Sequence, residues 1–291
     1  MITIILLAAP GTQALEPAFA EDLRRTWDGS DVTWLATDEA AEFSVPALPD
    51  DFWTAWERGQ KASIDLAAVP TRGRRKQMLL ADMDSTMIEQ ECIDELADEA
   101  GVGARVQDIT ERAMNGELDF EAALRERVQL LRGLDIGAIE TVLAKRITLM
   151  PGGKTLIATM KAQGAYTVLV SGGFTAFSSQ VAQKLGFDEH RANTLIVRKG
   201  VLTGEVGMPI LGRQAKVETL QDITRQREMS EADVIAVGDG ANDLGMLKRA
   251  GLGVALHAKP AVAAQSDIRI NFGDLTALLY LQGYAKSDFV S

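Results

Sequence analysis

Residues 78–86 read MLLADMDST, an apolar run that ends in two aspartates separated by one residue. Four consecutive apolar residues followed by a polar turn predict a buried strand over Met78–Ala81. Asp82 and Asp84 follow it at i and i+2, so both carboxylates can face one small volume, where repulsion favours protonating one of them or binding a cation. A nucleophile beside an acid is one interpretation of this pair, and a loop with a helix N-cap is the other.

Further apolar runs downstream alternate with amphipathic stretches, which is typical of a parallel sheet covered by helices. The expected strands are Tyr166–Val170, Thr194–Val197, Val234–Val237, Leu252–Ala255 and Ile268–Ile270. Ligand sites of open α/β sheets lie at the carboxyl ends of the strands. We therefore expect the turns that begin at Asp82, Ser171 and Gly238 to meet in space.

Residues 82–165 separate the first two expected strands, which is more chain than a crossover connection needs. Apolar spacing predicts helices within this stretch, interrupted by glycines. The expected helices are Ile88–Ala100, Arg105–Asn115, Phe120–Leu131 and Ile136–Arg146. We interpret the stretch as an inserted helical cap, at about residues 88–148, that covers the site and selects the substrate.

The first part of the chain differs in composition from the rest. All four tryptophans lie within residues 1–56, and residues 71–76, TRGRRK, form a basic connector that contains a glycine. The elements expected before this connector are a strand, a helix and a strand, over Ile2–Ala8, Pro17–Trp27 and Asp31–Ala36. We predict a small α+β domain over residues 1–72 and a larger α/β domain over residues 73–291.

The composition excludes several classes of protein. With 46% hydrophobic and 24% charged residues, a chain of 291 residues is expected to be globular. No apolar run approaches the roughly 18 residues that a membrane-spanning helix needs. The single cysteine and the two histidines do not suffice for a disulfide or a thiolate zinc cluster, so a metal is expected to be a hard cation held by carboxylates. The net charge of -11 argues against nucleic acid as a partner.

The start of the chain has two interpretations. Ala18-Phe19-Ala20 is similar to a signal-peptidase site, but no Lys or Arg precedes Arg24. A signal peptide normally begins with a basic region. We therefore expect a first buried strand and a cytoplasmic protein.

Two other motifs and one lysine carry residue types suited to phosphoryl transfer. The sequence GDGAND contains Asp239 and Asp243 in a glycine loop that can close on an ion, although alone it would suggest only a turn. Ser171 and Gly172 offer a hydroxyl and a backbone N–H to an anion, and Lys216 can add a point charge. Carboxylates that converge without histidine or cysteine describe a magnesium site completed by water and a substrate phosphate.

Together, and in this order, the four features resemble the motifs of the haloacid dehalogenase (HAD) superfamily. The resemblance covers residues 78–271, and Glu91 together with LRERV at 124–128 is similar to the members that act on O-phospho-L-serine. It implies a Rossmann-like α/β core with a parallel sheet and an inserted helical cap. It also implies hydrolysis of O-phospho-L-serine to L-serine and phosphate through an aspartyl phosphate, the last step of serine biosynthesis.

The resemblance further implies a role for each residue of the core. Asp82 would be the nucleophile, and Asp84 the acid that protonates the leaving hydroxyl and the base that then activates water. The residues implied as Mg²⁺ ligands are Asp82, Asp84 through its backbone carbonyl, Asp239 and, close behind, Asp243. Those implied as contacts of the substrate and its phosphoryl group are Ser171, Gly172, Lys216 and Asn242.

In the cap, the resemblance implies that the substrate is recognised as a zwitterion. Glu91 would pair with its ammonium group and Arg127 with its carboxylate, while Met114 and Phe120 would form an apolar wall. An aromatic residue or a methionine at helical spacing is also typical of simple core packing, so that alternative stays open for the last two.

The N-terminal segment resembles, more weakly, the ACT-like regulatory modules found in front of related enzymes. Three roles stay open for it: binding an amino acid, forming a homodimer, or supporting the catalytic domain. Two other functions for the whole chain also stay open. One is phosphoryl transfer from, or hydrolysis of, another small phosphorylated metabolite, and the other is amino-acid sensing by a protein that is no longer catalytic.

Overall fold

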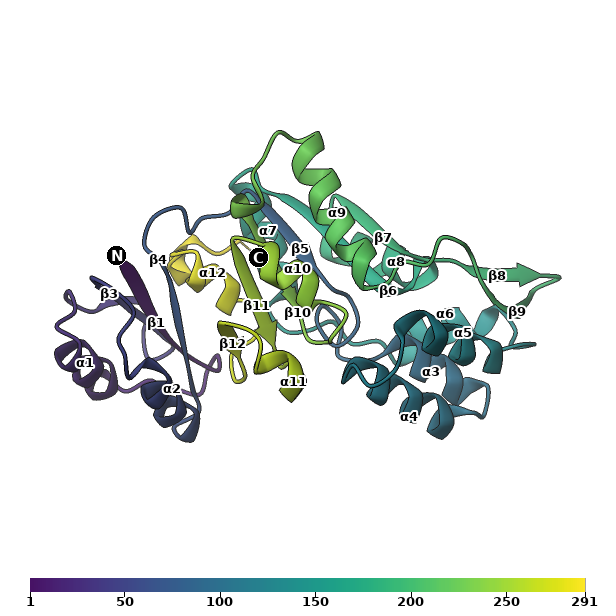
Figure 1. Ribbon diagram of the computed structural model, residues 1–291, viewed down its shortest axis with the longest axis horizontal. Coiled ribbons are helices and arrows are strands. Elements are labelled where there is room, and N and C mark those ends of the chain that lie inside the picture. Colours follow the sequence, from purple (N-terminus) through teal and green to yellow (C-terminus); the bar gives the residue numbers. More distant parts are fainter. Residues whose placement is uncertain (291) are drawn as a thin grey trace.

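The computed structural model describes residues 1–290, which form an elongated molecule with a parallel sheet at its centre (Figure 1). An antiparallel sheet lies at the N-terminal end, and a group of helices lies at the opposite end. This arrangement confirms the predicted α/β class with an added N-terminal α+β part. Among residues 1–290, no helix combines the length and the apolar character needed to cross a membrane.

The central sheet has six parallel strands in the order β12-β11-β10-β5-β6-β7. Their bounds are β5 Met78–Ala81, β6 Tyr166–Phe174, β7 Glu189–Asn193, β10 Val234–Gly238, β11 Leu252–Leu256 and β12 Ile268–Ile270. Strand β5, which leads to the first aspartates, lies between β10 and β6 and is buried along its whole length. The polar ends of these three neighbouring strands therefore share one edge of the sheet.

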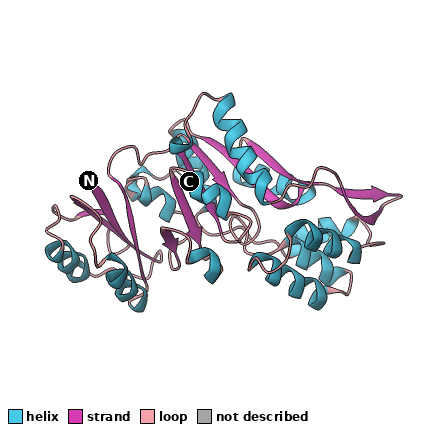
Figure 2. Ribbon diagram, viewed as in Figure 1, coloured by secondary structure: helices cyan, strands magenta, loops and turns pink. Residues whose placement is uncertain are grey.

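Helices cover both faces of this sheet because its strands are apolar on both sides (Figure 2). The helices are α7 Gly153–Ala162, α8 Thr175–Leu185, α9 Arg213–Gln226, α10 Leu244–Arg249, α11 Pro260–Ala263 and α12 Ala277–Leu281. Leu79 and Ala81 pack with α7, α8 and α12 on one face. Met78 and Leu80 pack with α9, α10 and α11 on the other.

The expected strand Thr194–Val197 was wrong as a member of the parallel sheet. Residues Leu195–Arg198 form β8, which pairs with β9 (Val201–Val206) in a separate antiparallel hairpin. The sixth strand of the parallel sheet is β7 instead, with the sequence EHRAN. An edge strand needs little apolar character, and this polar sequence therefore did not stand out.

The cap is helical throughout, and it joins the core through two adjacent strand-like segments. Its helices are α3 Cys92–Glu99, α4 Gly103–Met114, α5 Phe120–Leu130 and α6 Gly137–Lys145. The first helix begins later than predicted because Ile88 forms a bridge with Leu149 in the connection to the core. The Met150 N–H also donates to the Met87 carbonyl at 2.9 Å, so the entry and the exit of the cap are tied together.

The N-terminal sheet has the strand order β2-β3-β1-β4 and is antiparallel. Its elements are β1 Ile2–Ala8, α1 Pro17–Thr26, β2 Thr33–Ala36, β3 Ala40–Val45, α2 Phe52–Lys61 and β4 Ile64–Pro70. The βαββαβ order is of the ferredoxin-like type. The prediction contained only the first strand, helix and second strand, so it missed half of these elements.

Both faces of the N-terminal sheet are buried, each against a different partner. Ile4 and Leu6 pack with α1 and α2, whereas Ile5 and Leu7 belong to the same buried cluster as α12 of the parallel domain. The Tyr280 hydroxyl in α12 donates to the Glu39 carboxylate at 2.7 Å across this contact. The sheet is therefore docked on the rest of the chain.

Asp65 joins the N-terminal sheet to the backbone that follows β12 through several hydrogen bonds to one carboxylate. This β4 residue is fully buried, with 0% of its surface exposed. Its carboxylate accepts the backbone N–H groups of Asn271, Phe272 and Gly273, at 2.9, 2.9 and 3.0 Å. Burial raises the pKa of Asp65, and the three N–H donors oppose that rise because they stabilise the ionised form.

We predict that Asp65→Ala lowers the free energy of unfolding by about 3 kcal/mol, because it leaves three buried donors without an acceptor. Urea denaturation measures the change. Asp65→Asn should cost less, since its amide oxygen can still accept. Asp267→Ala, at an exposed position next to β12, is the matched control and should leave the midpoint unchanged. A midpoint for Asp65→Ala equal to that of the wild type would contradict the prediction.

Candidate active site

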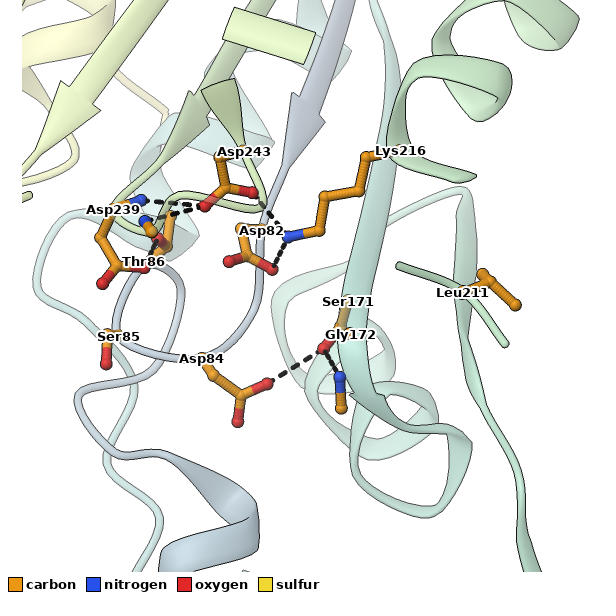
Figure 3. Close-up of polar contacts among 12 residues, drawn as sticks. Asp82, Asp84, Ser85, Thr86, Ser171, Gly172, Leu211, Lys216, Asp239 and Asp243 are labelled. Atoms are coloured by element: carbon orange, nitrogen blue, oxygen red, sulfur yellow. Dashed lines mark hydrogen bonds and ion pairs between the residues drawn. The ribbon is translucent and has the colours of Figure 1, made fainter. Parts of the chain in front are cut away.

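The carboxyl ends of β5, β6 and β10 bring together residues that are far apart in the sequence (Figure 3). Asp82 follows β5, Asp239 follows β10, and Ser171 lies near the end of β6. The three turns that were expected to meet do meet: the Ser171 hydroxyl donates to the Asp84 carboxylate at 3.0 Å, and carboxylate oxygens of Asp82 and Asp239 lie within 4.8 Å of each other. The parallel order of the strands produces this convergence.

Lys216, from α9, is the buried cation of the site. Its Nζ lies 2.6 Å from a carboxylate oxygen of Asp82 and 2.6 Å from one of Asp243 (Figure 3). Burial by itself disfavours the ammonium group, but the charges of Asp243 and Asp82 outweigh it and raise the pKa of Lys216 above its usual value. Lys216 is therefore charged, and it links the nucleophile candidate to the loop after β10.

Asp243 also shapes the loop that follows β10. Its second oxygen accepts the backbone N–H groups of Asp239 at 3.2 Å and of Gly240 at 3.0 Å. A Cβ atom on Gly238 would collide with the Asp243 carboxyl group, so this position requires glycine. The first glycine of GDGAND is therefore needed for the loop to close on its own aspartate.

The carboxylates of this site fit a metal ion. Asp82, Asp239 and Asp243 each offer one oxygen, and these atoms lie within 4.8 Å of one another. The Asp239 Oδ2 atom is buried and has no hydrogen-bond partner within residues 1–290. An all-oxygen donor set with a free buried oxygen suits a hard divalent cation.

The pKa values of these carboxyl groups also fit a site for a cation. Burial, followed by the charge of Asp243, raises the pKa of Asp82 well above its usual range, although Lys216 opposes the rise. Burial, reinforced by Asp243, raises the pKa of Asp239 to about 7. A divalent cation bound among these groups would stabilise their ionised forms.

Asp84 lies apart from this cluster, between the core and the cap. Its Oδ2 accepts the Ser171 hydroxyl, and its Oδ1 accepts the Cys92 N–H at 2.8 Å, at the start of α3. Gly173 passes so close that a Cβ there would lie 2.7 Å from Oδ2. The side chain of Asp84 is thus held beside the substrate cavity, and only its backbone carbonyl remains a candidate metal ligand.

One cavity is lined by predicted residues from both the cap and the core, whereas Ser171, Lys216, Asp239 and Asp243 lie outside its lining. It is lined by Asp82, Asp84, Glu91, Met114, Phe120, Arg127, Gly172 and Asn242, together with Ile93, Leu124, Gly173 and Phe174. The Phe120 ring lies over Gly172, where a Cβ would be 2.6 Å from its Cζ. Met114 and Phe120 therefore face the cavity and do not serve only as packing inside the cap.

Glu91 and Arg127 place an acidic and a basic side chain on the cap side of this cavity. The Ser85 hydroxyl donates to Glu91 at 2.8 Å. Burial, with the charges of Asp84 and Asp239, raises the pKa of Glu91 to about 8. Burial also lowers the pKa of Arg127, and the nearby acids, Glu91 foremost, oppose this effect.

Two residues that support the site had not been predicted from the sequence. Asn193, at the end of β7, donates to the Gly172 carbonyl at 2.8 Å and accepts the Leu211 N–H at 2.7 Å, so it fixes the last residues of β6. Thr110, in α4, accepts a hydrogen bond from Arg127. A buried Asn at the end of a polar strand was the available indication for the first, and no local pattern marked the second.

The parallel sheet, the inserted cap and the acidic strand ends define a hydrolase of the haloacid dehalogenase type. The family model described as haloacid dehalogenase-like hydrolase matches residues 79–248, and the chain belongs to this family. This result confirms the family inferred from the four motifs.

Among its relatives, the phosphoserine phosphatase of Archaeoglobus fulgidus is 41% identical over 221 residues. The match covers 75% of this chain and 64% of that relative, slightly less than two thirds of its length. A phosphoserine phosphatase solved as a phospho-aspartyl intermediate analogue is 44% identical, with a TM-score of 0.68 over 71% of this chain and 98% of the other. A HAD-family hydrolase from Salmonella enterica serovar Typhi is 31% identical, with a TM-score of 0.85 over 97% and 98% of the two chains.

We predict that Asp239→Asn raises the dissociation constant for a divalent cation at least about tenfold, because the cluster loses a charged ligand. Titration with Mn²⁺, followed by its paramagnetic resonance signal, measures binding without any substrate. Asp267→Asn is the matched control, since it makes the same change at an exposed position next to β12, away from the acidic cluster. Equal affinities of Asp239→Asn and the wild type would remove Asp239 from the metal site.

Proposed function

We propose that the protein is a Mg²⁺-dependent phosphatase that hydrolyses O-phospho-L-serine to L-serine and phosphate, the last step of serine biosynthesis. The observation that carries the proposal is a single cavity lined by Glu91 and Arg127 of the cap and by Asp82 and Asp84 of the core. A phosphomonoester that also bears an ammonium and a carboxylate group needs all four in one place. Similarity to phosphoserine phosphatases supports the same substrate.

Asp82 is the proposed nucleophile. Lys216 holds one oxygen of its carboxylate at 2.6 Å, which orients the group and leaves the second oxygen to attack phosphorus. As this oxygen bonds to phosphorus, the bond from phosphorus to the serine oxygen breaks. The products of this step are an aspartyl phosphate and a serine oxygen that takes up a proton.

Asp84 is the proposed proton donor and acceptor. It is proposed to give a proton to the departing serine oxygen. The resulting carboxylate then takes a proton from the water that attacks the aspartyl phosphate, which releases phosphate and restores both aspartates. The hydrogen bond from the Cys92 N–H stabilises the carboxylate between the two steps.

Four groups are proposed to contact the phosphoryl group: the Ser171 hydroxyl, the Gly172 N–H, the Lys216 ammonium and the Asn242 side chain. Asn242 lines the cavity and its Oδ1 is buried without a partner in the described part of the chain, so this side chain is free to turn toward a ligand. Mg²⁺ held by Asp82, Asp239, Asp243 and the Asp84 carbonyl would neutralise charge on the phosphoryl oxygens.

Selectivity is proposed to come from the cap. A substrate ammonium next to Glu91 would favour its ionised form and counteract the rise in its pKa to about 8. The planar guanidinium of Arg127 suits a carboxylate better than an ammonium group would. Met114 and Phe120 complete the walls and exclude water from the reacting groups.

We also propose that residues 1–72 form a domain that supports a phosphatase domain over residues 73–291, with the cap at residues 88–148. Support for this role comes from the sheet face that α12 covers and from the buried Asp65 contact.

A homodimer formed through the N-terminal domain stays a prediction that analytical ultracentrifugation tests. A cytoplasmic location is part of the proposal and agrees with the single, unpaired cysteine.

Phosphate release from a panel of phosphorylated amino acids and sugars, with and without Mg²⁺, tests the proposed function. We expect O-phospho-L-serine to be the best substrate and chelation of the metal to stop turnover. Asp82→Asn should lower turnover by at least about 10³-fold, because a carboxamide is no anionic nucleophile. Faster release from a sugar phosphate, or normal turnover by Asp82→Asn, would refute the substrate or the nucleophile, respectively.

We predict that Arg127→Ala reduces kcat/KM for O-phospho-L-serine by an amount equal to about 2–5 kcal/mol, because the substrate carboxylate is left buried and unpaired. An uncharged substrate, p-nitrophenyl phosphate, should lose much less, since it has no carboxylate. Steady-state kinetics with both substrates measure the difference. If both lost activity in the same proportion, Arg127 would have a structural role and not a selective one.

A further inference from the structure

Arg127 reaches the cavity from inside the cap, where its guanidinium group is held by two neutral acceptors. The side chain is 2% exposed and belongs to α5. Its Nε donates to the Ala123 carbonyl at 3.2 Å, and its Nη1 donates to the Thr110 hydroxyl oxygen at 3.0 Å. Within residues 1–290, Nη2 has no hydrogen-bond acceptor, so this nitrogen is available to a ligand in the cavity.

The Thr110 hydroxyl owes its orientation to a third helix of the cap. It lies 2.6 Å from the Asp94 Oδ1 in α3 and 3.0 Å from the Val106 carbonyl in its own helix. A hydroxyl has a single proton, and the shorter contact to a carboxylate is the stronger one. Donation to Asp94 therefore leaves the lone pairs of the oxygen to accept the Arg127 N–H.

We propose that Thr110, oriented by Asp94, is a positioning residue that turns the guanidinium of Arg127 toward the carboxylate of the substrate. Arginine has several rotatable bonds, and a bidentate contact requires its plane to be fixed beforehand. Asp94 contributes through the hydroxyl and not by direct pairing, because no ion pair within 4.0 Å joins it to Arg127 in the described part of the chain. A direct pair would compete with the substrate carboxylate for the same nitrogens.

This inference rests on the proposed function, because it concerns how the site selects a phosphorylated amino acid. The test compares kcat and KM for O-phospho-L-serine and for O-phosphoethanolamine, which has the ammonium group but lacks the carboxylate. We expect Thr110→Val to lower kcat/KM for phosphoserine about tenfold relative to phosphoethanolamine, mainly through KM. Thr110→Ser restores the hydroxyl and should recover most of the loss.

Thr141→Val is the matched control. Thr141 donates to the Gly137 carbonyl in α6, so its substitution removes a similar hydroxyl from the cap without affecting Arg127. The ratio of kcat/KM for phosphoserine to kcat/KM for phosphoethanolamine should stay unchanged in this variant. In an Arg127→Ala background, Thr110→Val should have no further effect on the ratio, since the residue it positions is gone.

If Thr110→Val fails to fold by circular dichroism, Asp94→Asn takes its place, because it keeps the shape of the side chain and weakens the acceptor of the hydroxyl. A ratio unchanged in the folded variant, or a Thr110 effect that persists in the Arg127→Ala background, would overturn the positioning role alone. Wild-type protein that does not hydrolyse phosphoserine would overturn the proposed function and this inference with it.

Discussion

The site depends on one buried cation shared by two carboxylates. Lys216 contacts both Asp82 and Asp243, and Asp243 in turn holds the N–H groups of the loop after β10. Removing one partner of such a buried group leaves an uncompensated charge, at a typical cost of about 3–5 kcal/mol. This interaction orients the Asp82 carboxylate and joins it to the loop after β10, and Gly238 is glycine because the Asp243 carboxyl group leaves no room for a side chain there.

A second set of hydrogen bonds joins the cap to Asp84 and to the loop after β10. Asp84 accepts one hydrogen bond from Ser171 in the core and one from the Cys92 N–H at the start of the cap helix α3. On the opposite side of the cavity, the Ala241 N–H in the acidic loop donates to the Met114 carbonyl at the end of α4 at 3.1 Å. The Asp84 side chain is thus held by one donor from the core and one from the cap, so its orientation depends on both parts of the chain.

The parts of this protein that could be predicted from sequence are those whose pattern is local. A buried run followed by Asp82 and Asp84, or by GDGAND, indicates both the strand and the residues at its end, because burial and chemistry are adjacent in the chain. The polar edge strand β7 and the later elements of the N-terminal sheet have no apolar run followed directly by a polar motif, so they were missed or misplaced. The link from Asp94 through Thr110 to Arg127 could not be predicted either, because it joins three helices whose packing no spacing rule specifies.

The N-terminal domain and the base of the cap both contact the stretch of backbone that follows β12. Asp65 binds the backbone of residues 271–273, and two residues further on the Leu275 N–H donates to the Pro151 carbonyl at 3.2 Å, where the cap returns to the core. Gly152 next to it has a positive φ of 78°, and a Cβ there would lie 2.8 Å from the Thr276 nitrogen, so this joint tolerates little displacement. A continuous series of backbone contacts therefore links the N-terminal sheet, through residues 271–276, to the point where the cap rejoins the core, and the first cap helix contacts Asp84 through the Cys92 N–H.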